Sequence, residues 1–461
     1  MVKMHGLFGV LMKRLIDYHL GIWKDSPLRQ PLLLRGARQV GKTYAARELG
    51  KEFPSFVEIN FESNKKAKTI FDADLDPHRI LREISAITEK QIIPGQTLLF
   101  LDEIQTIPDA IVALRYFYEI MPELHVIAAG SLLDFAIEQV GVPVGRVQFL
   151  YMYPMSFIEF LSALGHDIII KEILTHSVER EISRVIHDKI LGLLGNYLAI
   201  GGMPQFVACW KNMQNLHACS QVPQTLVAAY QYDFIKYGKS HQVKYLDVLF
   251  SHIPQQLGKK FKYSLVGDFR KRELEPCLDL LITAGVVHRI MHTDAHGIPL
   301  GAQADLDVFK LIFIDIGLSQ FILDLKTGDW LLNPLALFIN KGMLAESFVG
   351  QELIAYEHPM KKAKLYYWKR DARGSEAEVD YVIQHERQII PVEVKSGKGK
   401  TLRSMQTFLE SHRESPYGML FSTNNYSVHE KIHSYPLYAI AKVFADGDKD
   451  IRASIDLLLS K

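Results

Sequence analysis

Residues 32–49, LLLRGARQVGKTYAAREL, decide the fold of this chain. An apolar run that predicts a buried strand leads into a loop bounded by Gly36 and Gly41, and an alanine-rich helical pattern follows at once. Glycine at these two positions lets the backbone N–H groups of the loop curve around phosphate oxygens. Lys42 supplies a positive charge for the terminal phosphates, and Thr43 supplies a hydroxyl ligand for Mg²⁺. The stretch therefore predicts a nucleotide phosphate site formed by Gly36, Ala37, Arg38, Gln39, Val40, Gly41, Lys42 and Thr43.

A second motif, LLFLDE, follows some sixty residues later at 98–103. Its apolar residues predict a buried strand that ends at Asp102, which is placed to hold the water shell of Mg²⁺, while Glu103 is placed to polarise a water molecule. The apolar run HVIAAGS predicts a further strand ending at Ser131. We expect the Ser131 hydroxyl either between the attacking water and the γ-phosphate or at the N-cap of the next helix.

The composition bounds the class of protein. A chain of 461 residues is expected to form two to four domains, and its 48% hydrophobic and 23% charged residues are ordinary for a globular protein. With a net charge of +1, any nucleic-acid surface must be a local patch. The three cysteines form no CxxC pair, which indicates a reducing, cytoplasmic setting without structural zinc.

No stretch of the sequence predicts a membrane segment. The first twenty residues lack the apolar core and cleavage site of a signal peptide. The longest uncharged run, residues 190–210, contains several glycines and a proline, so it predicts a buried helix that ends at the turn GGMP.

The chain divides into four parts by pattern. Short apolar runs alternate with helical patterns in the first part, which predicts an α/β domain with a parallel sheet covered on both faces. A helical region, a basic part with the element order of a winged helix, and a second α/β part follow. The expected bounds are 1–160 for the phosphate-loop domain, 161–240 for a helical lid region, 241–335 for a winged-helix-like domain and 336–461 for the second α/β domain.

The winged-helix-like part carries a group of basic residues: Lys259, Lys260, Lys262, Arg270, Lys271 and Arg272. Contact with the DNA backbone is one interpretation of this group. A structural lid or packing domain is the other, because charged clusters are usually solvated faces.

A second chemical pattern, SEAEVDYVIQHERQIIPVEVKSGK, occupies residues 375–398. Side chains alternate along a strand, so Glu393 and Lys395 share one face. If the chain reverses at 386–387, Asp380 lies directly across from Glu393, near enough for both carboxylates to ligate one divalent cation. Lys395 would then position or activate a water molecule. Without a metal, the same side chains form a surface ion-pair cluster.

The motifs GARQVGKT, LLFLDEIQ, AAGS, GR, YPMSFIEF and GGMP resemble, in this order, the AAA-type ATPases that carry a DUF4143 region at the C-terminal end. The resemblance runs from Arg14 to the segment PVEVKSG. It implies ATP with Mg²⁺ as ligands and an ASCE-type sheet, with the strand of Asp102 beside the phosphate-loop strand or one removed from it. It also implies that Arg146 neutralises charge on the γ-phosphate, in cis or from a neighbouring subunit. The alternative for Arg146 is an ion pair with a surface carboxylate.

The second α/β part resembles the PD-(D/E)xK nuclease fold, although Val379 stands where the motif has proline. This resemblance implies a restriction-endonuclease-like module whose metal ligands are Glu346, Asp380 and Glu393.

These patterns together predict a cytoplasmic ATPase that acts on DNA or RNA through its C-terminal module. A homo-oligomer is expected if Arg146 acts between subunits. The alternative is a nucleotide-switched scaffold or regulatory protein that binds partner proteins and cleaves no nucleic acid.

Overall fold

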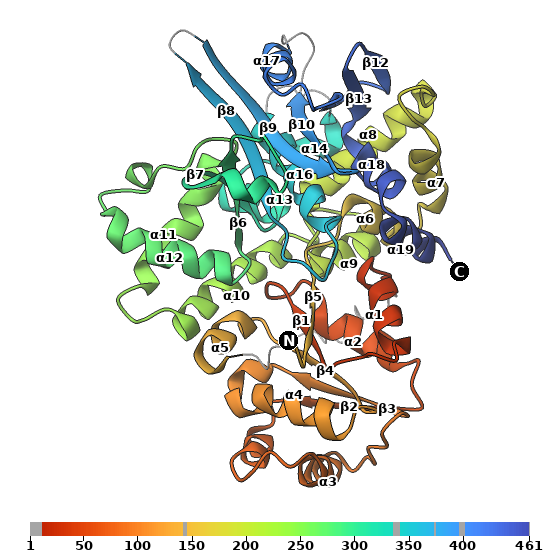
Figure 1. The fold of residues 1–461 in the computed structure, drawn as a ribbon, viewed down its shortest axis with the longest axis vertical. Coiled ribbons are helices and arrows are strands. Elements are labelled where there is room, and N and C mark those ends of the chain that lie inside the picture. The colour runs from red at the N-terminus through yellow and green to blue at the C-terminus, as the bar shows by residue number, and fades with distance from the viewer. Residues whose placement is uncertain (1–11, 142–144, 335–341, 373–374, 396–401, 461) are drawn as a thin grey trace.

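A five-stranded parallel sheet forms the first part of the chain in this computed structural model, which describes residues 12–141, 145–334, 342–372, 375–395 and 402–460 (Figure 1). The strand order is β2-β3-β4-β1-β5. The strands are β1 (Leu32–Arg35), β2 (Ser55–Asn60), β3 (Thr97–Asp102), β4 (His125–Ala129) and β5 (Gln148–Tyr151). One strand, β4, separates β3 from β1, which confirms the ASCE-type arrangement expected for the strand of Asp102.

The apolar runs of these strands are continuous because both faces of the sheet are covered. Leu32 and Leu34 of β1 pack on one face with α1 (Ile16–Asp25) and α2 (Lys42–Gly50). Leu33 packs on the other face with α3 (Pro77–Thr88), α4 (Pro108–Ile120) and α5 (Leu133–Val140).

Helices follow, as the pattern predicts: α6 (Phe157–Ala163), α7 (Asp167–Thr175), α8 (Arg184–Ile200), α9 (Pro204–Met213) and α10 (Gln221–Tyr237). The long uncharged run is divided between α8 and α9 by the turn at Gly201 and Gly202. The Gly202 N–H donates to the buried Asp315 carboxylate at 2.6 Å, which holds this turn against the core. Among the described residues, no helix combines the length and the apolar character needed to cross a membrane.

The remainder of the chain is built on one mixed sheet of eight strands, in the order β12-β13-β11-β10-β9-β8-β6-β7. The strands are β6 (Val287–Thr293), β7 (Ala304–Phe313), β8 (Leu365–Ala372), β9 (Ser375–His385), β10 (Gln388–Lys395), β11 (Gly418–Ser422), β12 (Ser427–His429) and β13 (Ile432–Pro436). Strand β6 pairs in parallel with β8, with Ile290 beside Leu365. The hairpin β6–β7 and the C-terminal strands therefore share one sheet across the expected boundary at 335.

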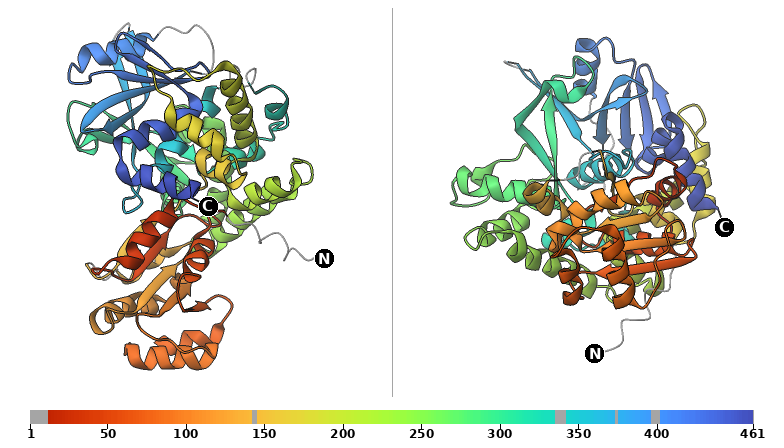
Figure 2. Two further views of the ribbon diagram at one scale, coloured as in Figure 1. Left: turned by 90° about the vertical axis from the view of Figure 1, so that its right-hand side faces the viewer. Right: turned by 60° about the horizontal axis from the view of Figure 1, so that its bottom comes forward.

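Helices complete this second body, which lies above the five-stranded sheet in Figures 1 and 2. They are α11 (Val243–His252), α12 (Lys271–Thr283), α13 (Ile316–Ile322), α14 (Asp329–Leu332), α16 (Gly342–Ala355), α17 (Arg403–Ser411), α18 (Ile440–Gly447) and α19 (Lys449–Leu459), with short 3-10 turns η4 (Ile253–Gln256), η5 (Tyr263–Leu265), η6 (Leu300–Gln303) and η7 (Leu437–Ala439). Two further 3-10 turns, η2 (Lys65–Phe71) and η3 (Ile104–Thr106), belong to the part built on the five-stranded sheet. The core helix α16 packs on β10, β8 and β7, and α19 returns to contact α1.

Candidate nucleotide site and carboxylate cluster

The phosphate loop connects β1 to α2 through backbone conformations that glycine allows. Gly36 and Gly41 have φ values of 142° and 105°, and Gln39 between them is also left-handed at 63°. A Cβ on Gly36 would lie 2.2 Å from the Met152 carbonyl oxygen, so this position has no room for a side chain. Helix α2 begins at Lys42, directly after the loop. The free N–H groups of its first turn therefore face the loop, as an anion site requires.

Lys42 lies inside this loop and is buried. Its ammonium group donates to the carbonyl oxygens of Gly36 and Ala37, each at 2.7 Å. Burial lowers the pKa of Lys42 to about 8, against the opposing effect of Glu103 and Asp102. The positive charge thus lies where the sequence predicts it.

Thr43 and Asp102 meet at the mouth of the loop. The Thr43 hydroxyl donates to the two Asp102 oxygens at 3.2 and 3.4 Å, and Asn60 Nδ2 donates to Asp102 Oδ2 at 3.1 Å. Burial raises the pKa of Asp102. Sequence reasoning missed Asn60, although it ends a predicted strand and lies beside Asp102 in the sheet register. Two hard oxygen donors side by side fit Mg²⁺, which takes its remaining ligands from phosphates and water.

Glu103 follows Asp102 in the left-handed conformation, at φ 54°. Gln105, which sequence reasoning also missed, donates its amide to Glu103 Oε2 at 2.6 Å and packs against Gly130. Ser131 follows Gly130 and is buried beside the phosphate loop, in a pocket that Gly36 and Ala37 also line. Helix α5 has Leu132 at its N-cap and no side-chain cap, so the structure does not support the capping alternative for Ser131.

Arg146 lies away from the phosphate loop of its own chain. It precedes β5, which runs parallel to β1 with Gln148 beside Leu32, whereas the loop follows the opposite end of β1. The side chain is 43% exposed and pairs with Glu119 of α4 at 2.9 Å. A role in cis does not fit this position, the pair with Glu119 is the surface ion pair given as the alternative, and a role across subunits stays a prediction.

Helix α10 holds the phosphate loop from the side of the second body. Asp233 pairs with Arg38 at 3.1 Å, and the Tyr230 hydroxyl donates to the Arg38 carbonyl oxygen at 2.7 Å. Lys236, one turn further on, pairs with Glu62 at 2.5 Å. Helix α10 therefore positions the loop through Tyr230 and Asp233, a role that no local pattern in the sequence reveals.

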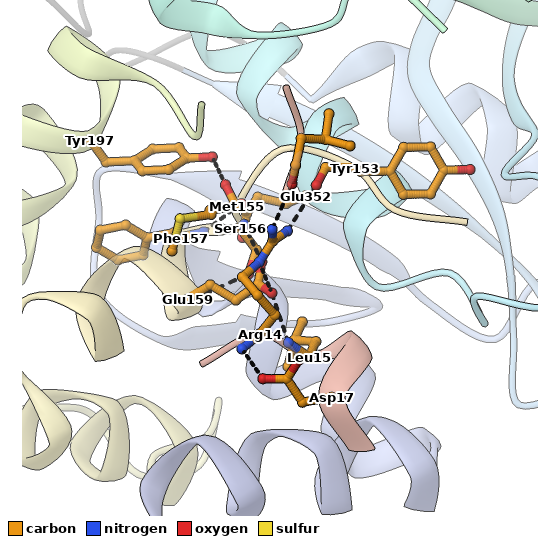
Figure 3. A network of polar contacts seen from close by, with 11 residues as sticks. Arg14, Leu15, Asp17, Tyr153, Met155, Ser156, Phe157, Glu159, Tyr197 and Glu352 are labelled. Carbon is orange, nitrogen blue, oxygen red and sulfur yellow. Dashed lines mark hydrogen bonds and ion pairs between the residues drawn. The ribbon is translucent and has the colours of Figure 1, made fainter. Parts of the chain in front are cut away.

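A buried network attaches the other side of the loop to the second body (Figure 3). Arg14 donates to the carbonyl oxygens of Val40 and Tyr153 and pairs with Glu159, each at 2.8 Å. Glu159 also accepts from the Ser156 N–H at 2.8 Å and completes the capping box of α6. One carboxylate thus fixes both the start of a helix and the arginine that supports the phosphate loop.

Glu352 of α16 extends this network. It accepts from the Phe157 N–H at 2.8 Å and from the Tyr356 hydroxyl at 3.0 Å. Burial is the main reason that the pKa of Glu352 is raised to about 8. A continuous set of hydrogen bonds therefore reaches from the phosphate loop to the core helix of the second body.

The C-terminal carboxylates meet at the hairpin β9–β10. Glu386 and Arg387 form its two-residue turn, both at positive φ, as the primed hairpin turns require. The paired register ends with Val392 beside Tyr381, so Glu393 and Asp380 occupy the next positions on the two strands, where the sequence predicts that they face each other. Asp380 Oδ2 accepts from the Val394 N–H at 2.8 Å.

Lys310 of β7 lies among these carboxylates, which sequence reasoning missed. Its ammonium nitrogen is 3.0 Å from Glu346 Oε1, 2.6 Å from Glu378 Oε1 and 4.0 Å from Asp380 Oδ1. Only 1% of the Lys310 side chain is exposed. The residue lies in the apolar pattern of an ordinary buried strand, so nothing local indicates that it meets carboxylates that lie far along the chain.

Glu393 and Lys395 form an ion pair beside this group. Burial and Asp380 raise the pKa of Glu393 to about 7. Across the described part of the chain, no three His, Cys, Asp or Glu side chains are placed to hold one metal ion. The predicted ligands Glu346, Asp380 and Glu393 thus converge, but their arrangement around Lys310 does not fit a divalent cation.

Comparisons with known proteins divide the chain in the same order. Family models match an AAA domain at residues 28–161, a domain of unknown function, DUF8612, at 191–329 and a second one, DUF4143, at 341–440. No curated protein matches the chain.

Two proteins are among the solved structures that are similar to the chain. The Walker-type ATPase PABY2304 of Pyrococcus abyssi is 13% identical, with 68% of this chain and 96% of that chain covered and a TM-score of 0.44. The ORC1 protein of Aeropyrum pernix in complex with DNA is 12% identical, with 71% and 96% covered and a TM-score of 0.31. The family matches and the strand order agree with the motifs: the chain carries an AAA domain at residues 28–161 and a DUF4143 region at residues 341–440, in the order that the resemblance predicts.

Proposed function

We propose that the chain binds ATP with Mg²⁺ and hydrolyses it at the carboxyl ends of β1, β3 and β4. The observation that carries this proposal is the contact between Thr43 and Asp102 at the mouth of a loop that already holds Lys42. When bound there by Thr43 and Asp102, Mg²⁺ would neutralise charge on the phosphate oxygens. The three free, buried cysteines agree with the cytoplasmic setting that we propose for this activity.

The side chains around the loop have separate tasks in this proposal. Lys42 exchanges its carbonyl partners for oxygens of the terminal phosphates. Glu103, held by Gln105, polarises the attacking water, and Ser131 donates to the γ-phosphate or to that water. The test is phosphate release by the full chain with ATP, in Mg²⁺ and in EDTA. Absence of Mg²⁺-dependent release at saturating ATP would contradict the proposal.

A second candidate function is action on nucleic acid through the second body, and the position of the basic residues favours it. Lys259, Lys260, Lys262, Arg270, Lys271 and Arg272 are all exposed. The segment 259–262 lies along β7. The Phe261 N–H donates to the Phe309 carbonyl oxygen at 2.9 Å, and the backbone of Lys260 pairs with that of Lys310 in an isolated antiparallel β-bridge. Exposed cations therefore lie next to the strand that enters the carboxylate cluster. In this proposal α11, α12 and the hairpin β6–β7 act as a winged-helix-like contact for the nucleic-acid backbone.

The salt dependence of DNA binding tests this candidate. Each phosphate contact contributes about 0.9 to the slope of log K against log salt, so replacing Lys259, Lys260 and Lys262 with glutamine should reduce the slope by about 2 to 3. A matched control replaces the exposed Lys51, Lys66 and Lys90 of the first domain and should leave the slope unchanged. Equal slopes in both triple variants would favour the alternative, a nucleotide-switched scaffold for partner proteins, and so would the absence of plasmid cleavage in Mg²⁺ or Mn²⁺.

A further inference from the structure

We propose that Lys310 is the resident cation of the carboxylate cluster and keeps it closed to a divalent cation while its side chain stays in place. The cluster consists of Glu346, Glu378, Asp380 and Glu393 with Lys310 and Lys395. The inference rests on the proposed action on nucleic acid, because it states when the carboxylate cluster proposed for that action can bind a divalent cation.

The contacts of Lys310 are those of a bound cation. Its ammonium group lies within 4.0 Å of oxygens from Glu346, Glu378 and Asp380, which come from a helix and a strand on different parts of the chain. It also lies 5.1 Å from the centre of the Tyr367 ring, a favourable position for a cation. A divalent ion entering among the same oxygens would meet a positive charge at contact distance, which is electrostatically unfavourable in a partly buried site.

The cluster is nevertheless short of partners for its carboxylates. Glu393 is 4% exposed, and its Oε2 atom has no hydrogen-bond partner among the described residues, while Oε1 is held by Lys395. A buried carboxylate oxygen without a partner costs free energy, so this atom marks a place for a further donor or cation. If Lys310 were absent, Glu346 and Asp380 would lose their shared counter-charge beside this free oxygen.

The cation comes from outside the DUF4143 region that supplies the carboxylates. Lys310 belongs to β7, at the edge of the sheet, in the segment matched by DUF8612. The exposed basic segment 259–262 is hydrogen-bonded to the same strand. A shift of that edge would therefore remove the resident cation without unfolding the hairpin that holds Asp380 and Glu393.

Direct counting of bound Mn²⁺ in the full chain, by loss of its free EPR signal, tests the proposal. In the wild type and in Lys310→Arg, which keeps the positive charge, we expect no Mn²⁺ binding that depends on Asp380. Adding Asp380→Asn to either protein should therefore leave its Mn²⁺ binding unchanged. Lys310→Met should gain Mn²⁺ binding at least about tenfold tighter than any site that the titration detects in the wild type, and Asp380→Asn in that background should abolish the gain. Wild-type binding that is as tight as in Lys310→Met and sensitive to Asp380→Asn would overturn the proposal, as would a folded Lys310→Met that gains no Mn²⁺.

A second variant covers the case in which Lys310→Met does not fold. Lys310→Met combined with Glu378→Gln removes one positive and one negative charge together, yet leaves Glu346, Asp380 and Glu393 for the metal. It should gain the same Mn²⁺ binding, and failure to do so would count against the proposal. Plasmid cleavage is scored separately. Mn²⁺ binding without cleavage contradicts the nuclease-like function alone, whereas Mg²⁺-dependent cleavage by the wild type contradicts the role of Lys310 alone.

Discussion

Lys42 is the residue on which nucleotide binding should depend most. It is the one cation of the loop that is buried, and its carbonyl partners leave it free to exchange them for phosphate oxygens. We expect Lys42→Ala to weaken ATP binding at least about 100-fold, because a buried charge pair loses its positive partner. Titration with a fluorescent ATP analogue measures this. Lys51→Ala, at the exposed end of α2, is the control and should bind normally; equal affinity in both variants would refute the assigned role.

Glu103 is expected to act on water rather than on binding. Glu103→Gln keeps the shape and the contact with Gln105, so ATP affinity should stay within about twofold while turnover falls by about 100-fold or more. Phosphate release at saturating ATP, beside the exposed control Glu123→Gln, separates the two effects. Normal turnover in Glu103→Gln would place the general base elsewhere.

At the scale of single elements, the start of α6 joins two buried carboxylates to the phosphate loop. Glu159 forms the capping box with Ser156 and pairs with Arg14, while Glu352 accepts from the next N–H along the helix, that of Phe157. Buried acids are costly when charged, so this junction should make the stability of the chain depend on pH.

The sign of that dependence follows from Glu352. Its pKa is raised from the ordinary 4.5 to about 8, so between these values the folded chain keeps a proton that the unfolded chain releases. The free energy of unfolding should therefore fall as pH rises from about 5 to 8, by up to about 1.4 kcal/mol per pH unit. Glu352→Gln can accept from Phe157 and donate to the Tyr356 hydroxyl without titrating, so its melting temperature should fall less over this range.

Thermal melts at pH 5 and pH 8.5 measure the difference between wild type and Glu352→Gln. Glu357→Gln, an exposed neighbour beyond the same helix, should follow the wild type at both values. Identical pH slopes in all three proteins would show that Glu352 is not the titrating group.

How far the sequence predicts an element depends on how local its determinants are. Strands β1, β3 and β4 follow from continuous apolar runs, and the turn at 386–387 follows from the spacing of its strands. The positions of Lys42, Thr43 and Asp102 follow from one motif pair, because both motifs end strands of one parallel sheet. Pairing of β6 with β8, about seventy residues apart, leaves no periodic signal in either strand.

The same reason explains what sequence reasoning misses in the two sites. Asn60 and Gln105 act through neighbours in the sheet and the turn, and Arg14 reaches Glu159 across 145 residues. In the sequence, Lys310 lies among the apolar residues of a buried strand. In the structure, its ammonium group lies beside carboxylates and neutralises part of their charge. Such contacts are set by the packing of distant segments rather than by composition.

At the scale of the whole molecule, Arg146 tests whether copies of the chain cooperate. It lies too far along the sheet to serve its own phosphate loop, and it is exposed. If it serves a neighbour, mixing Arg146→Ala with Lys42→Ala should restore part of the ATP hydrolysis that each variant lacks, because mixed interfaces pair an intact loop with an intact arginine. Phosphate release from the mixture measures this, with sizing in ATP.

Arg115→Ala is the matched control for Arg146, since both arginines pair with Glu119. It should hydrolyse ATP normally on its own. A monomer in ATP, together with no recovery of hydrolysis in the mixture, would exclude an arginine donated between subunits.

Helix α16 gives the molecule a rigid rod between its two polar centres. Glu352 holds the start of α6 at one point of this helix, and Glu346 contacts Lys310 six residues earlier, about 9 Å along the axis. Buried residues surround the rod on successive positions, from Leu344 to Leu353, so it cannot tilt without disturbing the core. An axial shift of α16 that accompanies a change at the phosphate loop would therefore move Glu346 as far as it moves Glu352. The distance between Glu346 and Lys310 in the second body would then change with the state of the phosphate loop.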